Sequence, residues 1–205
     1  MKAGKPVFTP TLPSIADGLA VSNIGVNAFA TVQPLLDRMI VVTEEAIALG
    51  LLRYVEEEKI VVEGAAASGL AAAMSGQLDE FKGKRVVFLL CGGNIASTTL
   101  SHSLERGLAS DGRLVRFILK VMGNVNEGIT ELCSLIVRCN CRVKNLTYER
   151  AWMQDIDAFT VTAIVESANA ENSESMKAEL SKRYDCRIVF NEFSSSDKNT
   201  ALNHF

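Results

Sequence analysis

The sequence predicts an α/β chain of two units, the first built on a parallel sheet and the second an α+β unit of order βαββαβ. Two observations predict this. Residues 37–107 alternate short β-branched runs with helical patterns, and the run "RVVFLL" at 85–90 is apolar on consecutive positions, as in a sheet covered on both faces. Beyond the polar stretch "ASDGR" at 109–113 the strands alternate instead, so that stretch is the expected linker.

The first unit is expected to begin with a strand, "RMIVVT" at 38–43. Thr43 precedes two glutamates, which suits a helix start, because acids complement the positive end of the helix dipole. A brief extended segment, "KIVV" at 59–62, leads into a helix rich in alanine and glycine. The strand at 85–90 then runs into "CGGN", and another helix follows it.

The second unit is expected to contain four strands and two helices. The strands are "LVRFILKV" (114–121), "CRVKNLTYERA" (141–151), "AFTVTAIVE" (158–166) and "CRIVFNEF" (186–193), and the helices are "NEGITELCSLIVRC" (126–139) and "AENSESMKAELSKRY" (170–184). This order is the ferredoxin-like plan, an antiparallel sheet with both helices on one face. We expect a second copy to cover the other face. The predicted domains are therefore 1–110 and 114–193, followed by a loose polar tail at 194–205.

Composition excludes several classes of partner. The 21 Lys and Arg residues against 24 Asp and Glu give a net charge of −3 without a long basic run, which disfavours nucleic acid. No run approaches the ~18 apolar residues that span a bilayer, and the first ten residues lack a secretory core, so a cytoplasmic protein is expected. The five cysteines suit reduced thiols. Cys139 and Cys141 lack the further ligands of a metal site, so no metal is expected.

The end of the strand at 85–90 is the first candidate site. Cys91, Gly92 and Gly93 would lie at the carboxyl edge of a parallel sheet, where ligands bind in open α/β folds. A two-glycine turn also occurs in purely structural loops, and a free cysteine is often a small buried hydrophobe. By themselves these residues therefore leave the function open.

Five stretches, which follow one another in the same order as in a known family, indicate what this candidate site resembles. They are "AGKPV" (3–7), "SIADGLAVSNIG" (14–25), "DRMIVVTEEAI" (37–47), "VVEGAAASGLAAA" (61–73) and "LLCGGNI" (89–95). With them, residues 1–108 resemble the fold-type II pyridoxal-phosphate enzymes, in the branch of threonine and serine dehydratases (ammonia-lyases) and serine racemase. The resemblance implies the C-terminal part of a large catalytic domain that binds pyridoxal 5'-phosphate and deaminates threonine or serine to a 2-oxo acid and ammonia.

The resemblance also implies roles for single residues. Cys91 holds the position that hydrogen-bonds the pyridine nitrogen of the cofactor, and Gly92, Gly93 and Asn94 resemble the loop that flanks the ring. A neutral partner leaves that nitrogen largely unprotonated, which suits β-elimination. Glu63 matches the family's acid beside the polar edge of the cofactor, although a carboxylate that merely starts a helix fits the sequence as well.

On the substrate side, Asp17 and Gly18 match the family's A-[DE]-G turn. Ordinary turn chemistry explains an aspartate that caps and a glycine that turns equally well, so both interpretations stand.

Two parts of the family's site are absent from the sequence. No Ser/Asn-hydrophobic-Lys-x-Arg-Gly segment supplies the Schiff-base lysine, and no glycine-rich loop cradles the phosphate. "MKAGKPV" already matches the interior of a longer homologous sequence. We therefore expect a C-terminal portion that is inactive by itself and needs the missing N-terminal half as a partner. The alternative is a non-catalytic amino-acid-binding or oligomerisation module that retains a relic of the enzyme.

The second unit resembles the ACT domain, a regulatory domain that many dehydratases of this branch carry. The resemblance implies a binding site for an amino-acid effector in the loop "MGNVNEGITEL" at 122–132, with Gly128 as the family's glycine and Asn124 and Asn126 as ligands. The family's Asp and Pro are replaced here. A capping loop that serves only dimerisation is the alternative.

Overall fold

The computed structural model describes residues 3–189 of the 205-residue chain. The chain divides into two compact units between Gly107 and Leu108, and each is described by itself. Within residues 3–189, no helix has both the length and the apolar character that a membrane crossing requires.

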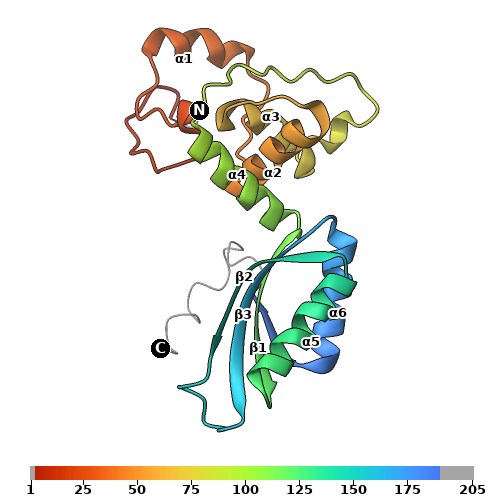
Figure 1. Cartoon of the computed structure of the whole chain (residues 1–205). Coiled ribbons are helices and arrows are strands. Elements are labelled where there is room, and N and C mark those ends of the chain that lie inside the picture. Colours follow the sequence, from red (N-terminus) through yellow and green to blue (C-terminus); the bar gives the residue numbers. More distant parts are fainter. Residues whose placement is uncertain (1–2, 190–205) are drawn as a thin grey trace. The chain divides into compact units, whose positions relative to one another are not determined.

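Helices and turns make up the first unit (Figure 1). The α-helices are α1 (Val26–Val32), α2 (Glu44–Arg53), α3 (Gly64–Met74) and α4 (Ser97–Ser110). Short 3-10 turns are η1 (Asp17–Leu19), η2 (Gln33–Leu35) and η4 (Asp79–Phe81), and a π-helical turn, η3 (Tyr54–Glu58), extends α2. The predicted start of α2 is confirmed, because the Thr43 side chain accepts a hydrogen bond from the amide of Ala46.

The core of this unit is the crossing of α2 and α3. Leu51 and Ala67 are fully buried, and a Cβ at Gly50 would lie 3.2 Å from the carbonyl oxygen of Ala67. The small side chains predicted for α3 thus allow the two helix backbones to approach closely. Helix α4 approaches α2 closely at Gly107, where a Cβ would lie 2.7 Å from the carbonyl oxygen of Ala48.

The prediction of two strands in the first unit is wrong. Residues 38–43 and 85–90 are irregular, and residues 3–107 contain no strand, so the predicted parallel sheet is not found there. Val41 is 82% exposed and Val87 is 83% exposed. The physical reason is that a strand exists only with a hydrogen-bonded neighbour, and these segments pair with none in the described chain.

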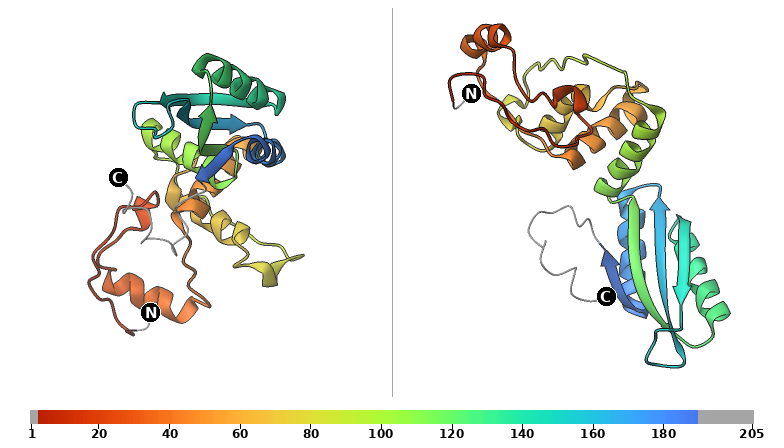
Figure 2. Two further views of the ribbon diagram at one scale, coloured as in Figure 1. Left: turned by 90° about the horizontal axis from the view of Figure 1, so that it is seen from below. Right: turned by 90° about the vertical axis from the view of Figure 1, so that its left-hand side faces the viewer.

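The second unit is a four-stranded antiparallel sheet with two helices. Its elements are β1 (Leu114–Met122), α5 (Val125–Arg138), β2 (Cys141–Glu149), β3 (Ala158–Ser167), α6 (Ala170–Arg183) and β4 (Asp185–Val189). The sheet order β2-β3-β1-β4 confirms the predicted βαββαβ plan. Both helices cover the same face, and the right-hand view of Figure 2 looks onto the sheet with them behind it.

Alternation along the two central strands places the core under the helices. Phe117 and Leu119 of β1 and Phe159 of β3 are fully buried with Leu135 of α5 and Met176 of α6. Outside the sheet, the predicted linker at 109–113 begins as the last two residues of α4. The predicted strand at 186–193 is described only to residue 189, and the predicted tail at 194–205 lies outside the described residues.

Candidate functional site

Three segments far apart in the sequence meet at the carboxylate of Glu63. A Cβ at Gly18 would lie 3.4 Å from Glu63 Oε1, and a Cβ at Gly92 would lie 2.5 Å from Glu63 Oε2. The carboxylate therefore lies between the η1 turn and the loop after residue 90. We call the group formed by Gly18, Glu63 and Gly92 the glycine corner.

Helix α3 and its backbone contacts position Glu63. The residue is the N-cap of α3, but its side chain makes no capping hydrogen bond, so the carboxylate is directed elsewhere. Its amide donates to the carbonyl of Gly92 at 3.0 Å, which fixes the loop against the helix start. Gly64 permits this approach, because a Cβ there would lie 2.2 Å from the carbonyl oxygen of Ile15.

Cys91 and the residues after Gly92 form the open side of the glycine corner. Cys91 is an exposed free thiol, so its interpretation as a small buried hydrophobe is wrong. Its sulfur has one long contact, 3.7 Å to the carbonyl of Leu89. Asn94 is exposed, and a Cβ at Gly93 would lie 3.1 Å from the carbonyl oxygen of Val61.

Asp17 faces solvent beside the same corner. Its Oδ1 accepts a hydrogen bond of 2.8 Å from the amide of Gly18. This contact closes the turn locally, as ordinary turn chemistry predicts. The other oxygen, Oδ2, is not used in that bond, so the carboxylate retains acceptor capacity toward a ligand on the exposed side.

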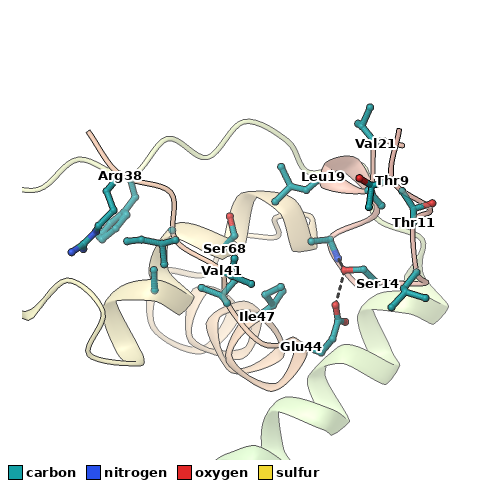
Figure 3. A pocket seen from close by; sticks show the side chains of 18 of the residues that line it. Thr9, Thr11, Ser14, Leu19, Val21, Arg38, Val41, Glu44, Ile47 and Ser68 are labelled. Atoms are coloured by element: carbon teal, nitrogen blue, oxygen red, sulfur yellow. Dashed lines mark hydrogen bonds between the residues drawn. The ribbon is translucent and has the colours of Figure 1, made fainter. Parts of the chain in front are cut away.

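A pocket of about 650 Å³ lies next to this turn rather than at the glycine corner (Figure 3). Ala16 and Leu19 line it, but Glu63, Cys91 and Gly92 do not. Its other walls come from residues 9–12, the irregular segment around Val41, residues 68, 69 and 72 of α3, and Phe88, with Ser14 and Glu44 on its polar side. The walls are mainly apolar, so we take this pocket as a packing surface and the glycine corner as the polar site.

The hydrogen-bonding groups of Cys91 and the glycine corner match one side of pyridoxal phosphate. An exposed thiol, two glycines and a carboxylate offer a hydrogen-bond donor, bare backbone and an acceptor in one place. Three lysines of the first unit have partners away from the glycine corner: Lys59 donates to the carbonyl of Glu56, Lys82 pairs with Asp79 at 2.8 Å, and Lys84 lies over the ring of Phe81.

The predicted effector loop lines a second pocket, of about 580 Å³, in the βαββαβ unit. Asn124 is the N-cap of α5, with its side-chain oxygen accepting from the amides of Asn126 and Glu127. Asn124 and Gly128 line the pocket, whereas Asn126 does not. A Cβ at Gly128 would lie 2.8 Å from Phe159 Cζ, so this glycine is also needed for α5 to pack on the sheet.

Both signs of charge surround this second pocket. Its ionisable lining residues are Lys120, Glu127, Glu131, Arg183, Tyr184 and Asp185. Burial, and then the charge of Glu131, raises the pKa of the Tyr184 hydroxyl. Within the described chain that hydroxyl oxygen is buried without a hydrogen-bond partner. A ligand with both an ammonium and a carboxylate group would find complementary charges here.

Sequence reasoning missed two residues near the glycine corner, Ser14 and Glu44. Ser14 Oγ donates to Glu44 Oε1 at 2.6 Å, and the amide of Ile15 donates to Glu44 Oε2 at 2.8 Å. The only signal in the sequence was an acid at a helix start, which the helix dipole already explains.

Comparison with known proteins points to one family. Residues 1–92 match the family model of the pyridoxal-phosphate dependent enzymes, whose cofactor is pyridoxal phosphate. An L-threonine ammonia-lyase of Geobacter sulfurreducens is 36% identical over 151 residues, which cover 73% of this chain and 37% of that protein. One of Thermotoga maritima is 32% identical over 191 residues, which cover 92% of this chain and 47% of that protein.

The chain therefore spans less than half the length of these curated relatives. Among solved structures, a formyltetrahydrofolate deformylase of Burkholderia mallei matches 37% of this chain and 26% of its own at 14% identity, with a TM-score of 0.29.

Proposed function

We propose that this chain is the C-terminal part of a pyridoxal-phosphate dependent threonine ammonia-lyase with an ACT-like regulatory domain, which deaminates L-threonine or L-serine to a 2-oxo acid and ammonia when complete. The observation that carries the proposal is the Glu63 carboxylate held between Gly18 and Gly92. All three residues lie within the part of the chain that matches the pyridoxal-phosphate family. The homologues named L-threonine ammonia-lyase support the reaction class.

The residues of the chain act on one side of the cofactor. When bound, pyridoxal phosphate withdraws electrons from the α-carbon of the amino acid, which allows the α-proton and the β-hydroxyl to leave. The Cys91 thiol would donate a weak hydrogen bond to the ring nitrogen and leave that nitrogen unprotonated. Glu63 would accept a hydrogen bond at the polar edge of the ring, and Asp17 and Gly18 would face the substrate. Gly93 and Asn94 would flank the ring from the loop.

The lysine that anchors the cofactor and the loop that holds its phosphate come from a partner, the N-terminal half of the enzyme. Two features of the first unit support such a partner. The irregular segments 38–43 and 85–90 expose Val41 and Val87 almost fully, together with backbone groups that no neighbouring strand uses. The 650 Å³ pocket beside them is mainly apolar. Strands added by the partner would cover both.

Cofactor trapping tests this proposal. The full chain is mixed with pyridoxal phosphate, reduced with borohydride and mapped by peptide mass spectrometry. Alone, it should give no stoichiometric adduct at a single lysine. Co-expressed with the part of the Thermotoga maritima protein that this chain does not match, it should give one adduct, on the supplied polypeptide, and form 2-oxo acid from threonine. A stoichiometric adduct at one lysine of this chain would overturn the proposal.

A pair of cysteine variants sharpens the test. In the assembled protein, Cys91→Ala should weaken cofactor binding, and Cys91→Ser should largely retain it, because serine keeps a hydrogen-bond donor. Cys133→Ala, in α5 of the second unit, is the matched control and should leave cofactor binding unchanged. Equal loss in all three variants would assign the effect to folding instead of ring contact.

In the same proposal, the βαββαβ unit regulates the enzyme and joins copies of the chain. An amino-acid effector would occupy the 580 Å³ pocket near Asn124, and the sheet face opposite α5 and α6 would form the contact between copies. The assembled enzyme is proposed to work in the cytoplasm.

A second candidate function is an amino-acid-binding module without catalysis. The 580 Å³ pocket favours it, because its residues all belong to the second unit and need no partner to complete the first. Calorimetric titration of the chain alone with the standard amino acids separates the two. Tight binding without any lyase activity in the co-expressed complex would favour the module.

A further inference from the structure

Residues 14–16 precede the Asp17–Gly18 turn, and the carboxylate of Glu44 holds them in place. Glu44 accepts a hydrogen bond from Ser14 Oγ at 2.6 Å (Figure 3). It accepts a second one from the amide of Ile15 at 2.8 Å. Ser14 Oγ in turn accepts from the amide of Ala16 at 3.0 Å. Three consecutive residues are thus tied to the first residue of α2.

These bonds fix the position of the glycine corner. The carbonyl of Ile15 lies directly on Gly64, where a Cβ would be 2.2 Å away, so residue 15 has no room to shift toward α3. Ala16 is 4% exposed and packs in the core of the first unit. Gly18 follows two residues later, and a Cβ there would be 3.3 Å from Ala65 Cβ and 3.4 Å from Glu63 Oε1. A release of Ser14 and Ile15 would therefore move Gly18 away from Glu63.

We propose that Glu44 is a positioning residue that holds residues 14–16 and so sets the distance of the Asp17–Gly18 turn from Glu63. The role in catalysis rests on the proposed function, whereas the mechanical role stands on these contacts. Hydrogen bonds to an ionised carboxylate are about twice as strong as bonds between neutral groups. The two bonds to Glu44 are therefore suited to holding residues 14–16 in place.

The neighbouring residue Glu45 provides a matched control. Both glutamates are in the first turn of α2 and complement its dipole equally. Glu45, however, pairs with Arg106 of α4 at 2.6 Å, whereas the hydrogen bonds to Ser14 and Ile15 belong to Glu44. A variant at Glu45 therefore removes the same charge from the same helix end without releasing the loop.

Amide hydrogen exchange of the full chain tests the mechanical role. Glu44→Ala should speed exchange at Ile15 and Ala16 by about tenfold or more, since both amides lose their acceptors or the group that orients them. Ser14→Ala should do the same at Ala16, and Ser14→Thr, which keeps the hydroxyl, should restore protection. Glu45→Ala should leave both amides at the wild-type rate. Unchanged exchange in Glu44→Ala, or equal acceleration in Glu45→Ala, would overturn the proposal.

Kinetics of the co-expressed enzyme test the catalytic consequence. Glu44→Ala should raise KM for threonine about tenfold with less than a twofold change in kcat, because the turn would contact the substrate without touching the reacting atoms. A merely structural role would lower the active fraction, and hence kcat, at constant KM, and that result would overturn the catalytic part. If the wild-type complex shows no lyase activity, the proposed function fails, while the exchange experiment still decides the role of Glu44.

Discussion

Gly92 shows how closely the backbone of the glycine corner approaches Glu63. The backbone at Gly92 lies so near the carboxylate that a Cβ on this residue would be 2.4 Å from Glu63 Cδ. Real Cβ contacts do not occur at this distance, so a substitution must displace either the carboxylate or the loop. Glycine at this position is therefore a requirement of the site as built, independent of which ligand occupies it.

The first prediction follows from this contact. Gly92→Ala should push the Glu63 side chain away and weaken cofactor binding in the co-expressed enzyme by about tenfold, the equivalent of 1.4 kcal/mol. The loss of stability should be smaller, since the clash is with a flexible side-chain end. Fluorescence titration with pyridoxal phosphate and a thermal melt measure the two. Gly25→Ala is the control, because its Cβ would meet only Ala28 Cβ at 4.0 Å. Equal affinity in both variants would contradict the prediction.

Asn124 and Asn126 provide the second prediction, which tests the capping role of Asn124. Asn124→Ala should lower the free energy of unfolding by about 1 kcal/mol, since its side-chain oxygen caps α5. Asn126→Ala removes an exposed side chain outside the pocket and should cost less than about 0.5 kcal/mol. Urea unfolding of the full chain measures both. If the two variants lose equal stability, the cap is not the role of Asn124.

At the scale of elements, the first turn of α2 connects residues 14–16 with α4. Burial raises the pKa of Glu45, but the hydrogen bonds from Arg106, Thr43 and its own backbone amide, with the charge of Arg106, together outweigh burial and hold the pKa below its ordinary value of 4.5. Glu44, one residue earlier, faces residues 14–16. Two adjacent acids in one turn thus tie two different segments to the same helix.

The third prediction is the pH dependence of the Glu45–Arg106 pair. Because the pKa of Glu45 is lowered in the folded state, its contribution to stability is fully present above about pH 5 and is lost as the pH falls through the folded pKa. Arg106→Gln should therefore cost about 0.5–1 kcal/mol at pH 7 and progressively less toward pH 3. Urea unfolding at a series of pH values checks this. A cost that is constant with pH would show that Arg106 acts through packing alone.

Local and non-local elements differ in how well the sequence predicts them. Helices α2 to α6 and the βαββαβ plan were predictable, because caps such as Thr43 and the alternation along β1 and β3 are visible within a few residues. The strands expected at 38–43 and 85–90 are not found, since strand formation depends on a neighbour that a single segment cannot reveal.

The glycine corner was predictable only in part for a similar reason. Resemblance to a family assembled Gly18, Glu63 and Gly92 as one set, and the structure brings these three together. Glu44 was missed because two kinds of glutamate look identical in sequence: one that only complements the helix dipole, and one that also binds a distant loop. The difference is a tertiary contact over 30 residues.

At the scale of the whole chain, the two units have cores of different quality. The second unit buries large side chains such as Phe117, Phe159 and Leu135 between its sheet and helices. The core of the first unit contains many alanines, among them Ala67 and Ala71. Large apolar side chains that could have enlarged that core are on its surface instead. A surface that carries many large apolar side chains is typical of a binding site for another polypeptide or of a site of aggregation.

The fourth prediction is that the chain alone associates through its first unit. Sedimentation velocity should show growing species as concentration rises, and Val87→Lys should reduce this growth without lowering the melting temperature, because Val87 is already 83% exposed. Trp152→Lys is the matched control: Trp152 is 86% exposed but belongs to the β2–β3 loop of the second unit. It should leave association unchanged.

Pairing of the βαββαβ units predicts a different signature, a discrete dimer that Val87→Lys does not affect. Co-expression with the proposed N-terminal partner should abolish the open-ended association but preserve the dimer, since the strands proposed for that partner would cover residues 38–43 and 85–90 and leave the sheet of the second unit free. A chain that stays monomeric at every concentration and melts in one cooperative transition would mean that these segments need no partner, and the proposed division of the active site between two polypeptides would then fail.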